Sequence, residues 1–276
     1  NENDAVSTEE MPRVLGLVRR AWELGADAFI IQDWGLMAEI RRRWPEVETH
    51  VSTQANVHDA RGVAWCRDTW GVDRVTLSRE LSLAEISRIA EEGVELECFG
   101  HGALCFCYSG VCLMSSLNGG RSANRGLCAQ PCRLPYDLID EDGSVMEIPG
   151  VATQGIPEKS RGVGGTRLLC PKDYCTVDHL AGMRDAGVGS LKVEGRMKAP
   201  DYVLSVVGAY RDALDALSAG EDSEAGAAAR HRRLKRAFNR DFTDSYLWGS
   251  SDNDMMSYER SNNRGEVVGE VVGSRQ

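Results

Sequence analysis

Four stretches of the chain repeat one order of polar and apolar residues. In each, a helix-like run ends at a glycine, which is followed by Ala or Val and then by a short apolar run. The stretches are 23–33, 69–80, 91–100 and 185–196, with Gly25, Gly71, Gly93 and Gly187. Glycine just past a helix end adopts the left-handed conformation that caps the helix, and the apolar run after it is typical of a buried strand. The pattern therefore predicts helices that alternate with strands.

The segments between these strands have the features of amphipathic helices. The apolar residues of 11–25 fall along one stripe at helical spacing. Ser82 and Glu85 have the spacing of a capping box at the start of another helix, and Pro200 suits the first turn of a third. A further strand is expected within 49–57.

This alternation with short links predicts an α/β fold with parallel strands and right-handed crossovers. A (β/α) barrel and an open doubly wound sheet both fit it. About five strands are recognisable, so a full eight-stranded barrel would require further βα units.

Residues 134–169 interrupt the alternation. They contain EDG at 141–143, which predicts a hairpin turn, so we interpret the region as an insertion. The apolar run at 264–273 predicts the beginning of a β-type unit. The expected organisation is a main domain over 1–258, with a cysteine cluster at 105–132, and the start of a C-terminal β domain over 259–276.

Composition and charge narrow the functional class. Of the 276 residues, 42% are hydrophobic and 27% are charged, as in an ordinary globular protein. No apolar run approaches the roughly 18–20 residues that span a bilayer, and no signal peptide is recognisable, so we expect a cytoplasmic protein with no membrane partner. The net charge of −10 argues against a broad nucleic-acid-binding surface. Two basic runs, 41–43 and 230–240, are interpreted as solvated helix faces.

Cysteine is the residue type with the most informative distribution. Cys105, Cys112, Cys128 and Cys132 lie in one stretch, with six, fifteen and three residues between them and turn-forming residues in the gaps. Four thiolates on flexible loops form a soft, tetrahedral ligand set that suits an iron–sulfur cluster or zinc. The total of nine cysteines is odd and clustered, unlike a disulfide framework. The others are interpreted as packing residues or bystanders: Cys66, Cys98, Cys107, Cys170 and Cys175. For Cys170 and Cys175, which frame CPKDYC, a local redox role is the alternative to simple burial.

Charged side chains near strand ends are the candidate catalytic residues. In the strand at 190–195, alternation places Lys192 and Glu194 on one face, and Arg196 and Lys198 follow as cationic donors for an anionic substrate. In a barrel these positions lie at the carboxyl end of the strand, where barrel enzymes have their active sites. The alternative is a buried structural ion pair.

The strand at 94–100 leads to a further candidate. One of its faces carries Glu95, Glu97 and Phe99. His101 follows beside Cys105 and has the chemistry of a general acid or base, or of a hydrogen-bonding partner behind the cysteines; an ordinary loop histidine is the alternative. Paired with Cys105 or Cys107, it would make the nucleophile of a thiol protease, although a lone nucleophile does not explain four clustered cysteines. The sequence contains no P-loop, zincin or serine-hydrolase motif.

Four motifs together resemble the collagenase-like peptidase family U32. They are ELECFGHGALCFCYSGVCLMSS at 95–116, NRGLCAQPCRLPY at 124–136, PKDYC at 171–175 and SLKVEGRMKAPDYV at 190–203. The motifs are highly specific in combination, and the resemblance covers most of the chain. It implies a TIM-like (β/α) barrel that is incomplete at its N-terminus, because the first one or two βα units are absent, followed by the start of a small C-terminal β domain.

The resemblance also implies a chemistry. Better-understood relatives take part in hydroxylating RNA bases, either tRNA uridine or ribosomal RNA cytidine, or ubiquinone rings. The RNA-acting and quinone-acting members resemble one another in carrying a [4Fe-4S] cluster. Its ligand pattern falls here on Cys105, Cys112, Cys128 and Cys132. In the tRNA branch, prephenate is implicated as a co-substrate.

The expected function is therefore iron–sulfur-dependent hydroxylation of an RNA base, with Lys192, Glu194, Arg196 and His101 as the catalytic candidates. The expected partners are tRNA or rRNA, a prephenate-like small molecule and a hydroxylase partner protein. Two alternatives stay open. One is a collagenase-like peptidase, as the family name says, and the other is a non-enzymatic iron–sulfur partner in a hydroxylase complex.

Overall fold

The computed structural model describes residues 5–146, 166–195, 198–221, 223–249, 253–258, 261–265, 269 and 272–273. The helices in these ranges are α1 (Met11–Glu23), α2 (Trp34–Arg43), α3 (Ala60–Trp70), α4 (Leu83–Ala90), α5 (Met114–Leu117), α6 (Leu180–Asp185), α7 (Pro200–Ala219) and α8 (Glu224–Ala237). The strands are β1 (Ala28–Ile31), β2 (Glu48–Val51), β3 (Arg74–Thr76), β4 (Glu95–Ala103), β5 (Asp173–Cys175), β6 (Val188–Val193) and β7 (Phe242–Thr243). Short 3₁₀ turns occur at η1 (Thr53–Ala55), η2 (Ala123–Arg125), η3 (Pro131–Arg133) and η5 (Asn253–Met255).

The glycine-capped repeats fold as predicted. Gly25, Gly71, Gly93 and Gly187 follow α1, α3, α4 and α6 with φ angles of 95°, 59°, 72° and 89°. A side chain disfavours this region of backbone space, so glycine ends each helix and turns the chain into the next strand. The strands β1, β3, β4 and β6 follow these glycines.

The predicted helix starts are also confirmed. The Ser82 hydroxyl accepts a hydrogen bond from the Glu85 amide at 3.3 Å, and the Glu85 carboxylate accepts one from the Ser82 amide at 2.8 Å. Both bonds satisfy amides that have no partner inside α4. Pro200 is the first residue of α7, where a proline has no helical amide bond to lose.

A mixed sheet with mostly parallel pairing connects these elements. Its order is β1-β2-β3-β4-β5-β7, and β6 pairs with β4 off this path. The pairs β1–β2, β2–β3, β3–β4, β4–β6 and β5–β7 are parallel, whereas β4 and β5 are antiparallel. The long strand β4 therefore joins three neighbours and is the centre of the sheet.

The sheet is open over the described ranges. There β1 pairs with β2 alone, and nothing pairs β1 with β6 or β7. The expected TIM-like barrel is thus not confirmed, and the open sheet that the same alternation permits is what these residues form. A barrel closes through eight tilted parallel strands. In this sheet five strands are parallel to one another, namely β1, β2, β3, β4 and β6, and β5 is antiparallel to β4.

The two faces of the sheet differ in chemistry. One face packs through Phe29, Ile31, Val51, Val75 and Leu96 on buried side chains of α1 to α4 and α6. Full burial of each such side chain stabilises the fold by about 1.5–3 kcal/mol.

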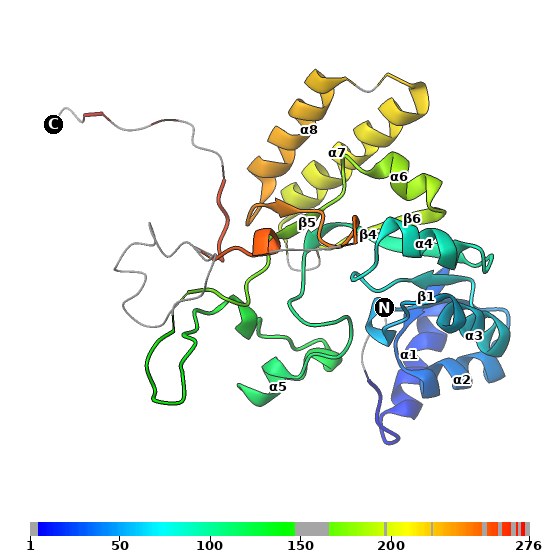
Figure 1. Ribbon diagram of the computed structural model, residues 1–276. Helices are drawn as coiled ribbons and strands as arrows, with labels where there is room; N and C mark the ends of the chain where they lie inside the picture. The colour runs from blue at the N-terminus through cyan, green and yellow to red at the C-terminus, as the bar shows by residue number, and fades with distance from the viewer. Residues whose placement is uncertain are drawn as a thin grey trace.

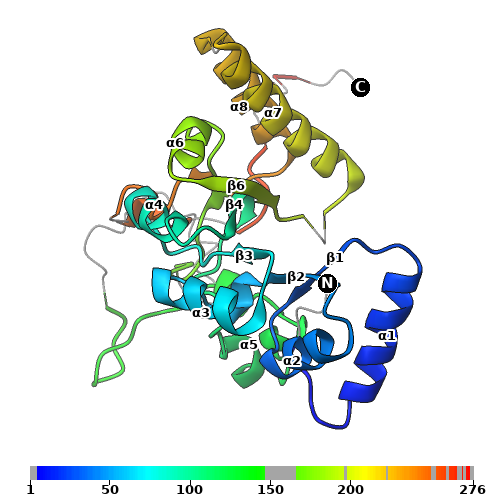
Figure 2. The same ribbon diagram turned by 90° about the vertical axis from the view of Figure 1, so that its right-hand side faces the viewer.

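A second core lies where α7 and α8 pack on β5 and β6. The segment that carries α5 lies on the other side of the sheet from α2 and α3 (Figures 1 and 2).

The expected insertion is described only at its two ends. A hairpin turn forms there as predicted, because Ile139 bridges Val145 and the Met146 amide donates to the Leu138 carbonyl at 2.8 Å. Tyr136 bridges Thr166, which joins the two ends of the insertion. Residues 147–165 lie outside the described residues, as do most of 259–276, where the C-terminal β domain is expected.

Candidate functional site

The four predicted ligand cysteines lie around one cavity of about 110 Å³. Cys105 follows the end of β4, Cys112 precedes α5, Cys128 follows η2, and Cys132 lies within η3. Cys107 lines the same cavity as a fifth thiol. Loops that are separate in the sequence therefore bring five cysteines together, as the clustered spacing predicted for four of them.

Two features hold these loops in place. Gly110, at φ 78°, lies so close to the Gln54 carbonyl that any side chain would collide with it, which fixes the first cysteine loop against η1. The buried Arg133 guanidinium donates to the Leu104 carbonyl at 2.7 Å, to the Pro171 carbonyl and to the Cys170 sulfur at 3.3 Å. Arg133 thus ties the end of β4 to the segment that precedes β5.

The thiols affect one another. Burial raises the pKa of Cys132 to about 11, although the adjacent Arg133 acts in the opposite direction. Burial, followed by the neighbouring Cys112, raises the pKa of Cys107 to about 11. Thiolates crowded into one cavity repel one another, so their joint ionisation calls for a bound cation.

The donor set consists of soft sulfur ligands, whose chemistry suits an iron–sulfur cluster or a zinc ion. Within the part of the chain that the structure describes, no three His, Cys, Asp or Glu side chains converge as ligands of one metal ion. The cysteines are instead distributed around a cavity.

Beside the cysteine cavity, the face of the sheet opposite the helices carries a polar network centred on Glu97. This buried carboxylate accepts hydrogen bonds from the hydroxyls of Thr76 and Ser190, each at 2.9 Å. The cations Arg74 and Lys192 lie 3.8 Å and 3.9 Å from its oxygens. Strands β3, β4 and β6 each contribute to the network, because parallel pairing aligns Thr76, Glu97 and Ser190 across the sheet.

Arg79 connects the cysteine cavity to this polar face. Its guanidinium donates to the Cys105 sulfur at 3.2 Å and to the Ser109 hydroxyl at 3.3 Å. The same guanidinium lies 5.4 Å from the ring centroid of Phe99, and the Lys192 ammonium lies 5.5 Å from it. Burial acts to lower the pKa of Arg79, but the charges of Cys105, Glu80 and Glu194 outweigh it and raise the pKa above its usual value.

His101 has a different place from the one that its sequence position indicated. It lies within β4 rather than in a loop, and its ring is buried among Tyr202, Tyr210 and Phe242, with centroids 5.4 to 6.2 Å away. Burial lowers its pKa to about 4, although Asp173 acts to raise it. Its Nε2 atom is buried and has no hydrogen-bond partner. His101 is therefore neutral near pH 7, and it does not line the cysteine cavity.

Lys192 and Glu194 lie on or directly after β6, but the carboxylate that Lys192 approaches is Glu97 rather than Glu194. Glu194 lies where β6 passes closest to β4. The Glu194 amide donates to the His101 carbonyl at 2.8 Å, and a Cβ atom on Gly102 would lie 2.7 Å from the Glu194 carbonyl. Arg196 lies outside the described residues.

Sequence reasoning did not select Arg79 or assign Glu97 a role. For Glu97 the alternation along β4 was a usable signal, since it places Glu95, Glu97 and Phe99 on one face. For Arg79 the sequence pattern is less informative. Arg79 and Glu80 form a polar pair directly after an apolar strand. Its contact with Cys105 joins residues 26 positions apart.

Comparison with known proteins identifies the family. A family model described as Peptidase family U32 matches residues 2–257. The chain belongs to peptidase family U32. This confirms the resemblance that the four sequence motifs carry.

Relatives within this family carry different names. The chain is similar to the 23S rRNA 5-hydroxycytidine C2501 synthase of Escherichia coli (strain K12), at 34% identity over 98% of this chain and 39% of that protein. It is similar to the tRNA hydroxylation protein P1 of Bacillus subtilis (strain 168), at 35% identity over 88% of this chain and 54% of the relative. It also matches a protein named Collagenase from Porphyromonas gingivalis, at 31% identity over 90% of this chain and 58% of the relative.

The chain therefore spans about two fifths to three fifths of the length of these relatives. Among solved structures, it matches the U32 peptidase Mk0906 with a TM-score of 0.30 and 24% identity, over 34% of this chain and 39% of that one. No helix in the described ranges is long and apolar enough to cross a membrane.

Proposed function

We propose that this chain is part of an enzyme that hydroxylates an RNA base, and that Cys105, Cys112, Cys128 and Cys132 hold a [4Fe-4S] cluster in it. The observation that carries the proposal is the convergence of these four thiols on one cavity, which Arg79 joins to the polar face of the sheet. The names of the relatives from Escherichia coli and Bacillus subtilis support an RNA substrate. An RNA substrate also accords with a cytoplasmic location.

The bound cluster would supply electron transfer. The residues around it have separate tasks. Arg79 stabilises negative charge at Cys105 and presents the rest of its guanidinium towards Phe99. Lys192, balanced by Glu97, contributes a cation on the same face. Two cations at one aromatic ring suit a small carboxylate-bearing co-substrate such as prephenate.

We further propose Lys192, Glu194 and Arg196 as substrate-site residues, with His101 as a positioning residue behind them. The Glu194 amide donates to the His101 carbonyl, which holds these two backbone segments together. Support for a (β/α) barrel in the complete protein comes from the five strands in parallel register and the one-sided layer of helices. In such a barrel the polar face around Glu97 would point inward.

A peptidase is the second candidate, because one similar protein is named Collagenase. A thiol peptidase requires a histidine within hydrogen-bonding reach of its cysteine. In the described ranges His101 contacts Tyr210 through Nδ1, at 3.5 Å, and its Nε2 atom has no partner. This geometry favours the hydroxylase over the peptidase.

The deciding experiment is mass spectrometry of tRNA and rRNA nucleosides from a strain that lacks the gene. We expect one hydroxylated base to disappear and to return when the wild-type gene is restored, but not when Cys112→Ser is supplied. Cys66→Ala, a change in the helix-packed core, is the matched control and should restore the base. An unchanged nucleoside profile, together with gelatin cleavage by the purified protein, would replace the hydroxylase with the peptidase.

The cofactor is tested separately on anaerobically purified protein. We expect about four irons per chain. Cys105→Ser, Cys112→Ser, Cys128→Ser and Cys132→Ser should each lose iron, whereas Cys107→Ser should keep it. Cys170→Ser belongs in the same series, because the Cys170 sulfur shares Arg133 with this region and lies within electrostatic range of Cys132. One zinc in place of iron would overturn the assignment.

A further inference from the structure

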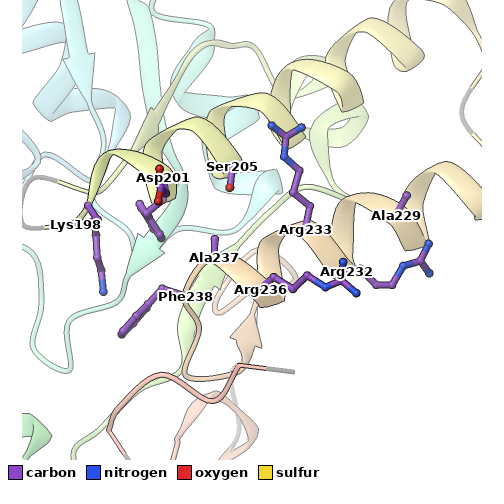
Figure 3. Close-up of a pocket in the computed structure, with 11 residues that line it drawn as sticks. Lys198, Asp201, Ser205, Ala229, Arg232, Arg233, Arg236, Ala237 and Phe238 are labelled. Atoms are coloured by element: carbon purple, nitrogen blue, oxygen red, sulfur yellow. The ribbon is translucent and has the colours of Figure 1, made fainter. Parts of the chain in front are cut away.

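A second cavity, of about 740 Å³, lies between the start of α7 and the C-terminal half of α8 (Figure 3). We call it the α7–α8 groove. One stripe of α8 lines it, formed by Ala229, Arg232, Arg233, Arg236 and Ala237. These positions recur every three or four residues, so they share one face of the helix. Lys198, Asp201, Tyr202 and Ser205 line the opposite wall, and Phe238 lies at the end of α8.

The groove is cationic in a protein of negative net charge. Lys198, Arg232, Arg233 and Arg236 line it, with Asp201 as the acidic member of the wall. The whole chain has a net charge of −10. In the sequence alone, the basic run at 230–240 indicated a solvated helix face. In the structure, three of its arginines line the α7–α8 groove. A local positive potential of this kind attracts anions to the groove, whereas the rest of the negatively charged surface repels them.

Arg233 is built into the wall. Figure 3 shows its side chain directed from α8 towards α7. It bonds to the Asp212 carboxylate and to the Leu204 carbonyl, each at 3.1 Å. A side chain at Gly208 would collide with its guanidinium, so the glycine makes the space for it. Arg232 and Arg236 are exposed on the same stripe and lie one helical turn apart, with Cβ atoms roughly 5–6 Å from each other.

Lys198 closes the other end of the groove. Its ammonium lies 2.9 Å from the ring centroid of Phe238 and 5.6 Å from that of Tyr202. Asp173, the carboxylate that acts to raise its pKa, is already paired with Arg240 in a buried salt bridge. Burial, followed by Arg240, lowers the pKa of Lys198 to about 8. A bound anion would supply the negative charge that this site lacks.

We propose that the α7–α8 groove binds the sugar–phosphate backbone of RNA, with Lys198, Arg232 and Arg236 as the phosphate contacts. The volume exceeds what a single phosphate needs and suits a short stretch of backbone. Tyr202 connects the groove to the sheet, because it donates to the Glu194 carbonyl at 3.2 Å and packs against His101. An RNA strand held here would pass beside Glu194. The assignment of RNA, rather than another polyanion, rests on the proposed function.

The test is fluorescence polarisation with a labelled single-stranded RNA and the full-length, iron-loaded protein. We compare wild type with the double variant Arg232→Glu/Arg236→Glu. The matched control is Arg211→Glu/Lys235→Glu, which makes the same charge change on α7 and α8 outside the groove. The loss of two phosphate contacts should reduce the steepness of the plot of log affinity against log salt concentration by about 1.4. The affinity should fall at least about tenfold, while the control stays within about twofold.

Melting temperature and iron content show that each variant is folded and loaded. A second variant, Lys198→Gln, should weaken binding, and Lys198→Arg should restore it because the charge is kept. Equal affinities of the groove variant and wild type would overturn the proposal, as would an equal loss in the control. Binding of anionic phosphatidylglycerol vesicles through the groove, with no RNA binding, would also overturn it.

The outcome separates this inference from the proposed function. If the groove variants lose RNA binding but deletion of the gene leaves every hydroxylated base intact, the groove assignment stands and the hydroxylase proposal fails. If deletion removes a hydroxylated base but the groove variants bind RNA as wild type does, the hydroxylase proposal stands and the groove assignment fails.

Discussion

The cysteine cavity and the α7–α8 groove differ in the structural elements and side chains that form them. The cavity measures about 110 Å³ and is formed by loops, with five thiols in its wall. The groove measures about 740 Å³ and is formed mainly by two long helices, with four cations in its wall. Soft sulfur donors around a small space suit a metal cluster, whereas fixed guanidinium groups along a helix suit a polyanion. Under the two proposals made above, reaction chemistry and RNA binding occupy separate parts of this protein.

The cysteine cavity and the groove meet at the C-terminal end of β4 and at β6. Cys105 lies two residues after the end of β4, and His101 on that strand packs against Tyr202, which lines the groove. The β4–β6 pairing therefore sets the distance between cavity and groove. Changes confined to one region should affect one property, and changes at this junction should affect both.

The largest expected effect comes from removing a cluster ligand. Cys105→Ser or Cys112→Ser should reduce iron content and product formation by roughly 100-fold or more, because the loss of a ligand exceeds the 10–100-fold cost of losing a residue that merely orients one. RNA affinity should stay within about twofold of wild type, since the groove is untouched. The measurements are iron analysis, nucleoside mass spectrometry and fluorescence polarisation. A parallel loss of RNA affinity would show that the two regions are not independent.

Gly102→Ala should destabilise the fold at the junction of β4 with β6. Gly102 has φ 128°, and a Cβ atom there would lie 2.7 Å from the Glu194 Cβ and carbonyl oxygen. Backbone strain and overpacking together should lower the free energy of unfolding by about 4 kcal/mol, as measured by urea denaturation. Gly71→Ala is the matched control, because Gly71 also has a positive φ but nothing within 4 Å of its Cβ position. If the two variants lose the same stability, the close approach of β4 and β6 is not what Gly102 serves.

His101 should make the junction sensitive to acid. Burial lowers its pKa to about 4 from the usual 6.5, so between these values the unfolded chain binds a proton that the native protein does not. The stabilisation is complete above about pH 6.5 and is lost as the pH falls towards 4, by about 3 kcal/mol in total. His101→Phe should flatten this pH dependence in urea denaturation. Replacement of the exposed His58 by Gln should leave it unchanged.

The smallest expected effect is a pH dependence of RNA binding in the groove. Because the pKa of Lys198 is lowered to about 8, RNA affinity should fall about threefold as the pH rises from 7 to 9 and the ammonium deprotonates. Folding stability should change in the opposite direction over that interval, since deprotonation removes the cost of a buried charge. Lys198→Arg should abolish the pH dependence of binding, because arginine stays charged. Persistence of the dependence in this variant would assign it to another group.

Much of the local structure could be predicted from the sequence. Glycine caps, the Ser82–Glu85 capping box and the strands β1 to β4 and β6 all depend on residues near one another in the chain. Clustering of the cysteines was predictable for a related reason, since four soft donors in one turn-rich stretch are typical of a shared metal site. The antiparallel β5 was not predicted, because it does not follow a glycine-capped helix, the pattern that reveals the equally short β3.

The sequence by itself therefore determined which residues are caps, strands and soft donors, because those properties follow from side-chain chemistry and short-range spacing. Tertiary structure decided which of them meet. It directed Arg79 to Cys105, paired Lys192 with Glu97 instead of Glu194, and buried His101 among aromatic rings. It also turned a basic helix face into one wall of a groove. Such contacts join residues that are distant in the chain, and they depend on strand pairing and helix packing, which no local pattern encodes.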